Sequence, residues 1–121
     1  MNTLVSVNNL SKNFSRFEAV KNISFTINEG EILGLLGPNG CGKTTTIGMM
    51  LGLLKPTNGE VVINGLNVEK NRIKLLRRMN FISPYIELPK KLTVRENLMV
   101  YGKLYSVYGI KNRIDYLTET L

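Results

Sequence analysis

The chain contains 121 residues, 43% of them hydrophobic, which is enough for one modest core, so we expect one small domain or part of one. A single cysteine and the absence of histidine exclude an internal disulfide, a zinc site of cysteine and histidine ligands, and an imidazole base. The formal net charge of +7 is uneven along the chain. The first residues lack the pattern of a secretory signal, and with no 18 consecutive apolar residues we expect no membrane-spanning helix in this sequence.

The N-terminal third of the chain has the pattern of β-strands. Polar and apolar residues alternate at Leu4 to Asn8 and again at Ile23, Phe25 and Ile27, which predicts antiparallel strands with one solvent-exposed face. The segment Ile32 to Leu36 is a nearly uninterrupted apolar run, which is typical of a parallel strand buried on both faces. We therefore expect two kinds of strand within the first 36 residues.

A glycine-rich motif follows this apolar run and has the phosphate-binding form GxxxxGK[ST]. Glycines can adopt backbone angles that turn successive N–H groups toward a β-phosphate, and a lysine adds a full positive charge between the β- and γ-phosphates. A threonine hydroxyl suits Mg²⁺, for which we assign Thr44, and Thr45 can bind the α-phosphate. The candidate phosphate-binding residues are Gly37, Pro38, Asn39, Gly40, Cys41, Gly42, Lys43, Thr44 and Thr45.

The residues that follow the motif favour this interpretation over a glycine-rich turn that matches by chance. Ile47, Leu51 and Leu54 are spaced as one face of a helix over Thr44 to Leu54, whose N-terminus would point its dipole at the phosphates. For Cys41 we favour a small side chain with a useful N–H over a redox role.

The next elements are shorter and more polar. Glu60 to Asn64 predicts a strand, Asn71 to Arg78 predicts a basic helix, and Phe81 with Ile82 predicts a short apolar strand before a proline-containing loop. Eight basic residues against the single acid Glu87 lie between Lys70 and Arg95. This run can bind nucleic acid or anionic lipid, but a solvated helix face is the simpler interpretation, because no stacking aromatics are interleaved with it.

Two helices are predicted at the C-terminal end. Thr93 and Glu96 have the spacing of a capping box, after which an apolar face is expected to pack into the core. The residues of that face are Val94, Leu98, Tyr101, Tyr105 and Tyr108. A second helix is predicted after Gly109, with its apolar residues in register at Ile110, Ile114, Leu117 and Leu121.

Taken together, these residues resemble the N-terminal half of an ABC transporter ATP-binding subunit, and the resemblance covers essentially the whole chain. The segments that carry it are Asn9 to Phe14, Val20 to Ile27, Gly30 to Thr45, Gly59 to Gly65 and Leu92 to Leu98. The resemblance implies an α/β fold of the P-loop NTPase type, incomplete, with an N-terminal antiparallel β segment and the start of the helical subdomain. Residues 1–92 would form the ATP-binding core and residues 93–121 the start of the helical subdomain.

The same resemblance implies ligands and partners. ATP and Mg²⁺ would bind the phosphate loop, Phe14 would stack on the adenine ring, and Val20 would pack near the ribose and base; otherwise Phe14 is an ordinary hydrophobic residue at a strand end. A transmembrane permease subunit would dock on the loop from about Pro84 to Leu92, and a second ATP-binding subunit would complete a dimer. The protein would then be cytoplasmic and peripheral at the inner face of the cell membrane, with no nucleic acid expected.

Two departures from the family pattern limit the expected chemistry. Ser83 or Pro84 stands where the family usually has a glutamine near Mg²⁺ and the attacking water. The signature loop, the apolar strand ending in Asp and Glu, and the switch histidine are all missing, so we assign no catalytic residue and expect no hydrolysis by these 121 residues alone. A non-catalytic nucleotide-binding remnant or interaction module is the alternative, and an ABC-type ATPase of DNA metabolism or translation is a third, weaker one.

Overall fold

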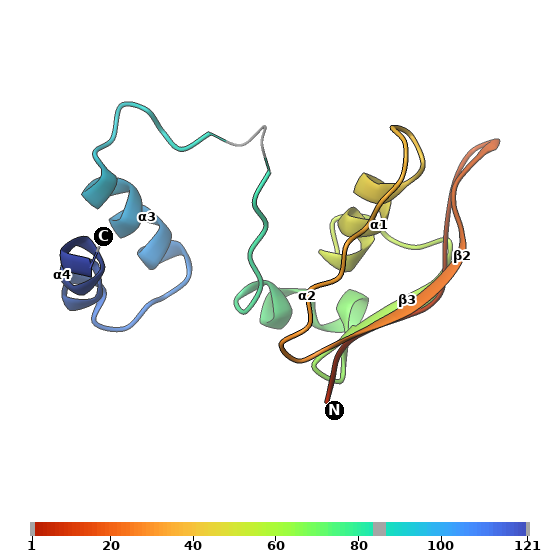
Figure 1. The fold of residues 1–121 in the computed structure, drawn as a ribbon, viewed down its shortest axis with the longest axis horizontal. Coiled ribbons are helices and arrows are strands. Elements are labelled where there is room, and N and C mark those ends of the chain that lie inside the picture. The colour runs from red at the N-terminus through yellow and green to blue at the C-terminus, as the bar shows by residue number, and fades with distance from the viewer. Residues whose placement is uncertain (1, 84–86, 121) are drawn as a thin grey trace. The chain divides into compact units, whose positions relative to one another are not determined.

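The computed structural model describes residues 2–83 and 87–120, which form two compact units that divide after Met79. The first unit contains the strands and helices α1 and α2, and the second contains helices α3 and α4 (Figure 1). The expected boundary at residue 92 between a core and a helical subdomain stays a prediction. Each unit is described by itself below.

The first unit is built on a four-stranded antiparallel sheet. Strands β1 (Thr3–Phe14) and β2 (Phe17–Asn28) form a long hairpin, and β3 (Asn58–Ile63) and β4 (Leu66–Asn67) extend the sheet in the order β2-β1-β3-β4. In β1 and β3, alternate residues point into the core, including Val5, Val7, Val61 and Ile63. The predicted antiparallel strands and the predicted strand at Glu60 to Asn64 are confirmed, since their alternating apolar residues supply one buried face.

Helices α1 (Lys43–Met50) and α2 (Val68–Leu76) belong to the same unit and bury Met49, Val68 and Leu75 in its core. The helix that we predicted to reach Leu54 ends earlier. The Gly52 N–H donates to Met49 O at 3.0 Å and the Leu53 N–H donates to Gly48 O at 2.8 Å, which is a Schellman termination at a glycine with positive φ.

The apolar run Ile32 to Leu36 does not form the buried parallel strand that its sequence predicts. It is assigned to no strand, and the side chains of Ile32 and Leu36 are 97% and 93% exposed. Within the described part of the chain, the four-stranded sheet does not include this run, so no neighbouring strand pairs with its backbone there. The short strand expected at Phe81 and Ile82 is likewise not formed.

In the second unit, α3 (Val94–Leu104) begins at the predicted capping box and packs against α4 (Ile110–Thr120). Asn97, which is buried, donates from Nδ2 to the carbonyl oxygens of Pro89, Leu92 and Thr93 at 3.1 to 3.3 Å. The preceding loop is thereby attached to the helix. A Cβ on Gly102 would lie 2.1 Å from Ile110 Cδ1, so a larger residue at this position would require the Ile110 side chain to move.

The predicted core-facing stripe of α3 is only partly correct. Leu98 is half-buried, but Val94 and Tyr108 are exposed, and Tyr101 and Tyr105 each remain 37% exposed. The helix ends at Leu104, so Tyr108 lies in the turn before α4 and outside the helical register. The second predicted helix is confirmed, with Ile114 as its buried residue.

Candidate nucleotide-binding site

The phosphate-binding motif lies between the extended segment at 32–36 and α1, and it is seated against strand β2. Gly42 has a φ of +94°, and a Cβ at this position would lie 2.3 Å from the carbonyl oxygen of Ala19. Only glycine combines this backbone conformation with such a close approach. Ala19 and Gly42 therefore fix the distance between the loop and the strand.

The N-terminus of α1 faces the loop, and no side chain caps it. Gly42 is the N-cap residue, no side chain caps the helix, and its first turn contains no acid. The first N–H groups of a helix have no intrahelical acceptor, and the dipole concentrates positive charge there. This end of α1 therefore favours an anion.

The side chain of Lys43 curls back across the loop. Its ammonium donates to the carbonyl oxygens of Gly37 at 2.5 Å and Pro38 at 2.7 Å, and Cys41 Sγ lies 3.6 Å away. The Cys41 N–H in turn donates to Pro38 O at 3.3 Å. These bonds hold the positive charge inside the loop, beside the N-terminus of α1.

The threonines that follow Lys43 have different roles. Thr46 is buried, and its hydroxyl donates to Gly42 O at 2.9 Å, so it stabilises the first turn of α1. Thr44 is exposed and Thr45 half-buried, and within the described residues neither hydroxyl has a hydrogen-bond partner. Their side chains are thus available to a ligand. No group of three or more Cys, Asp or Glu side chains that could hold a metal occurs among the described residues.

A hollow of about 520 Å³ lies between the loop and β2. Val20, which is buried, lines it together with Gly40, Gly42 and Lys43, and its contact with a ribose or base stays a prediction. Phe17 and Lys21 also line it, and sequence reasoning missed them. Continuing the alternation across the turn at residues 15–16 would have placed Phe17 opposite Phe14, with which it pairs in the hairpin.

Phe14 lies at the end of β1 and is 45% exposed, and it is not among the residues that line the hollow. Lys12 Nζ lies 5.1 Å from the centroid of this ring, within cation–π range. The aromatic side chain is thus accessible on the hairpin that borders the site, and its contact with a base stays a prediction. Of the positions expected to replace the family glutamine, Ser83 is described, and Pro84 lies outside the described residues, as does the start of the predicted permease-docking loop.

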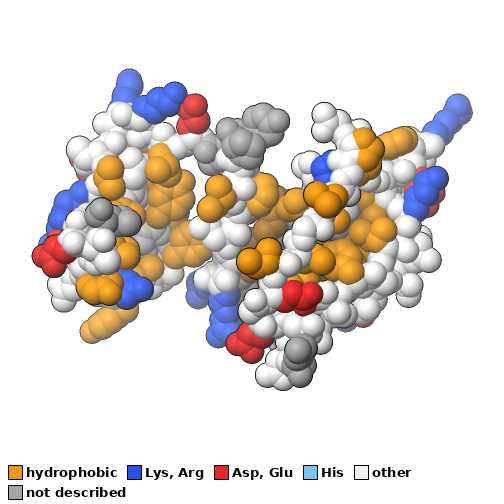
Figure 2. All heavy atoms as spheres, viewed as in Figure 1, with side chains coloured by type: hydrophobic (Ala, Val, Ile, Leu, Met, Phe, Trp, Pro, Cys, Tyr) orange, Lys and Arg blue, Asp and Glu red, His pale blue; other side chains and the backbone are white. Residues whose placement is uncertain are grey.

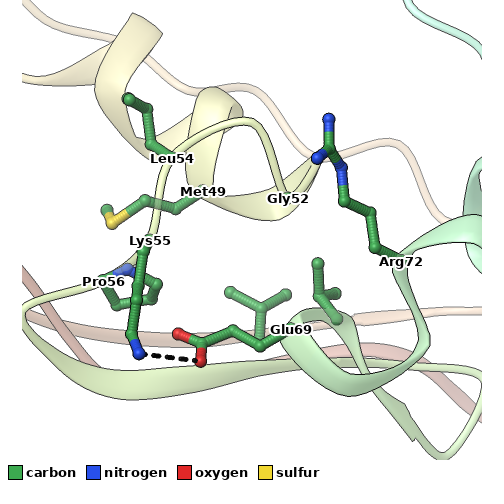
Figure 3. Close-up of a pocket in the computed structure, with 9 residues that line it drawn as sticks. Met49, Gly52, Leu54, Lys55, Pro56, Glu69 and Arg72 are labelled. Atoms are coloured by element: carbon green, nitrogen blue, oxygen red, sulfur yellow. Dashed lines mark ion pairs between the residues drawn. The ribbon is translucent and has the colours of Figure 1, made fainter.

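A second pocket, of about 260 Å³, lies at the other end of α1, between α1, β3 and α2 (Figure 3). Its walls are mostly apolar, formed by Met49, Leu54, Val61 and Val68, and an ion pair of 3.7 Å joins Lys55 to Glu69 at its edge. None of the phosphate-loop residues lines it, so the hollow beside β2 is the better candidate for a nucleotide.

Among the residues that the structure describes, no helix is both long and apolar enough to cross a membrane.

Comparison with known proteins identifies relatives along the whole chain. Residues 20–121 match the family described as "ABC transporter". The bacitracin transport ATP-binding protein BcrA of Bacillus licheniformis is 40% identical over 98% of this chain and 39% of its own length. The uncharacterized ABC transporter ATP-binding protein YhcH of Bacillus subtilis shows the same identity and coverage. The chain thus spans about two fifths of the length of these relatives.

Solved structures agree with this result. An ATP-binding subunit of an ABC transporter superposes with a TM-score of 0.79 at 30% identity, over 88% of this chain and 45% of that one. A putative ABC transporter ATP-binding protein from Pyrococcus furiosus gives a TM-score of 0.74 at 30% identity, over 89% and 52%. These neighbours confirm the expected partial P-loop NTPase fold, and the match over residues 20–121 shows that the chain belongs to the ABC transporter ATP-binding family.

Proposed function

We propose that this chain binds MgATP through residues 37–45, as part of the ATP-binding subunit of a membrane transporter. The observation that carries the proposal is the position of the Lys43 ammonium, which the carbonyl groups of Gly37 and Pro38 hold inside the loop beside the uncapped N-terminus of α1. A full charge and a helix dipole then favour the same anionic group.

The loop supplies two kinds of phosphate contact in this proposal. Backbone N–H groups from Gly40 to Thr45 bind phosphate oxygens, and Lys43 exchanges its carbonyl partners for oxygens of the β- and γ-phosphates. The exchange is favourable because a phosphate oxygen carries formal charge and a carbonyl oxygen does not. The glycine at 42 keeps these donors close to β2.

The hydroxyl of Thr44 fits a Mg²⁺ that is shared with the nucleotide. It is a hard oxygen donor, it is exposed, and no protein group within the described residues forms a hydrogen bond with it. With no acidic cluster among those residues, the remaining ligands would be phosphate oxygens and water, which is how Mg²⁺ commonly binds nucleotides. The ion would offset phosphate charge, and Thr44 would orient it.

The nucleoside would lie on the β2 side of the loop. Val20 offers an apolar wall there, and the accessible rings of Phe14 and Phe17 offer surfaces on which a base can stack. The proposal assigns adenine stacking to Phe14, and Phe17, which borders the hollow directly, is a second candidate.

Hydrolysis and transport belong to the complete protein in this proposal. Glu18 is the only acid among the residues that line the hollow, and its carboxylate lies 3.7 Å from Lys21 Nζ. We assign it no role with the attacking water, and expect no turnover by these residues alone. The complete subunit would pair with a second one and act at the inner face of the membrane through a permease.

The test is MgATP binding to this chain and to Lys43→Ala, measured by isothermal titration calorimetry, with Lys111→Ala as a control that removes an exposed charge from α4. Loss of the charge-assisted phosphate contacts should cost about 2 kcal/mol or more, which is about a 30-fold weaker affinity. Lys111→Ala should bind as the parent does. Equal affinities for the parent and Lys43→Ala would reject the site.

A further inference from the structure

Helix α2 and the two residues that follow it form the most basic surface of the first unit. Glu69 is the only acid from Val68 to Arg78, and Lys55 contacts it at 3.7 Å. The basic residues of this stretch have no ion pair within the described part of the chain. They are Lys70, Arg72, Lys74, Arg77 and Arg78.

The side of α2 that faces away from the core combines charge with an exposed apolar residue. Val68 and Leu75 are buried, whereas Lys70, Ile73, Lys74 and Arg77 line one shallow depression together with Glu69, Asn71 and Arg72. Their spacing of three, four and seven residues is that of one helix face, and they stay together although Asn71 departs from helical angles. We call these four residues the α2 basic face.

Ile73 is 77% exposed at the centre of this face. Its neighbours are long cationic side chains, which can spread sideways toward phosphates while the isoleucine points outward. Hydrophobic side chains are also exposed elsewhere on this unit (Figure 2), but Ile73 shares its depression with four cationic side chains and only one acid, Glu69, which Lys55 contacts. An apolar centre with a basic rim matches the boundary between the phosphate layer and the acyl chains of a bilayer.

We propose that the α2 basic face docks on an anionic phospholipid surface. Lys70, Lys74 and Arg77 contact lipid phosphates, and Ile73 enters the headgroup layer. Charge complementarity supports a phosphate-bearing partner, and the exposed isoleucine favours lipid over nucleic acid, since this segment contains no aromatic residue on which bases could stack. This contact goes beyond attachment through a permease and does not depend on the phosphate loop.

The test is co-sedimentation of the 121-residue chain with vesicles of equal phosphatidylglycerol and phosphatidylcholine, compared with vesicles of phosphatidylcholine alone. The chain should bind the anionic vesicles at least about 10-fold more tightly. Each cation near such a surface contributes about a 5-fold change in binding, so Lys70→Gln, Lys74→Gln and Arg77→Gln together should weaken it on the order of 100-fold. The matched control is Lys91→Gln, Lys103→Gln and Lys111→Gln, which removes the same charge from exposed positions elsewhere and should change binding only a few-fold.

Two further measurements separate the possible outcomes. Ile73→Ser should weaken binding to anionic vesicles without changing the circular dichroism spectrum, because the side chain is exposed in the folded unit. Competition with a 20-nucleotide single-stranded oligomer tests whether the α2 basic face binds nucleic acid instead of lipid. Equal losses in the two triple variants, equal binding to neutral vesicles, no effect of Ile73→Ser, or tighter binding to the oligomer than to the vesicles would each overturn the proposal.

Discussion

Gly42 lies so close to Ala19 that a methyl group on its α-carbon would be 2.3 Å from the Ala19 carbonyl oxygen. This contact joins residues far apart in the sequence: a phosphate-loop glycine that is the N-cap of α1, and a strand residue of the N-terminal hairpin. The contact with β2 therefore constrains the conformation of the loop, in addition to the loop's own sequence. It also constrains the position of Lys43, the next residue.

Gly42→Ala should displace the loop from β2 and weaken MgATP binding by about 10-fold or more. The added methyl group meets a backbone carbonyl, which cannot swing aside as a side chain can, and the positive φ adds about 1–2 kcal/mol of strain. Calorimetric titration measures the affinity, and amide chemical shifts of Ala19 and Val20 report the displacement.

Gly30→Ala is the matched control for that strain. Gly30 has a φ of +76°, but nothing lies within 4 Å of the position that its Cβ would take. The variant should lose some stability and keep its affinity for MgATP. If both substitutions weaken binding equally, the contact with Ala19 is not what positions the loop.

Cys41 offers a direct probe of the same loop, because it is the only cysteine in the chain and is exposed. Its sulfur lies 3.6 Å from Lys43 Nζ, so a nucleotide whose phosphates contact Lys43 should shield it. We expect MgATP to slow alkylation of Cys41 by N-ethylmaleimide at least about 5-fold, as measured by mass spectrometry, since the thiol must be open to solvent to react.

AMP is the control for this protection, because it carries the base and sugar but lacks the β- and γ-phosphates. At the same concentration it should leave the alkylation rate nearly unchanged. Equal protection by AMP and MgATP would place the phosphates away from Lys43 and contradict the proposed orientation of the nucleotide.

The exposed run at 32–36 should make the chain bind apolar dyes. Ile32 and Leu36 are almost fully exposed, and neighbouring apolar residues enlarge the exposed apolar surface. Replacing both by serine should lower the fluorescence of bound anilinonaphthalene sulfonate without lowering the melting temperature, because in this chain neither side chain contributes burial to the folded state.

Leu53→Ser with Leu104→Ser gives the comparison, since these leucines are also exposed but lie apart in the sequence and in different units. Their replacement should change dye binding less, because scattered apolar residues do not form a patch. A fall in melting temperature for the Ile32 and Leu36 variant would mean that the run packs against other residues.

Features set by local sequence rules were predictable here. The capping box at Thr93 needs only two side chains one turn apart, and the antiparallel strands need only alternation, so both were predicted and are confirmed. The phosphate loop likewise lies directly before a helix, as its motif requires.

Features that depend on distant partners were not predictable from local pattern. The composition of Ile32 to Leu36 favours a strand, yet a strand forms only where a neighbour completes its hydrogen bonds, and the described residues provide none for it. Phe17 was missed for a related reason, because its place beside the hollow follows from the hairpin register and not from its own neighbours.

The capping box of α3 predicts a pH dependence confined to the second unit. The Thr93 N–H donates to Glu96 Oε2 at 2.7 Å, and the Thr93 hydroxyl donates to the same oxygen at 2.8 Å. Both bonds favour the charged carboxylate, the backbone bond most, so they hold the pKa of Glu96 below its ordinary value. The start of α3 is thus stabilised at pH values above the ordinary glutamate pKa, and that stabilisation is lost as the pH falls through the depressed pKa of the folded state.

This dependence can be followed through the carboxyl carbon of Glu96 and the amide proton of Thr93, by nuclear magnetic resonance from neutral to acidic pH. We expect both signals to titrate together, with a midpoint below that of an unstructured glutamate, and the first turn of α3 to fray through the same range. In Glu96→Gln the amide can still accept from the Thr93 N–H but does not titrate, so the fraying should lose its pH dependence. A midpoint for Glu96 at or above the ordinary value would show that the capping box does not hold the carboxylate in solution, since a bonded carboxylate must release its proton more readily than a free one.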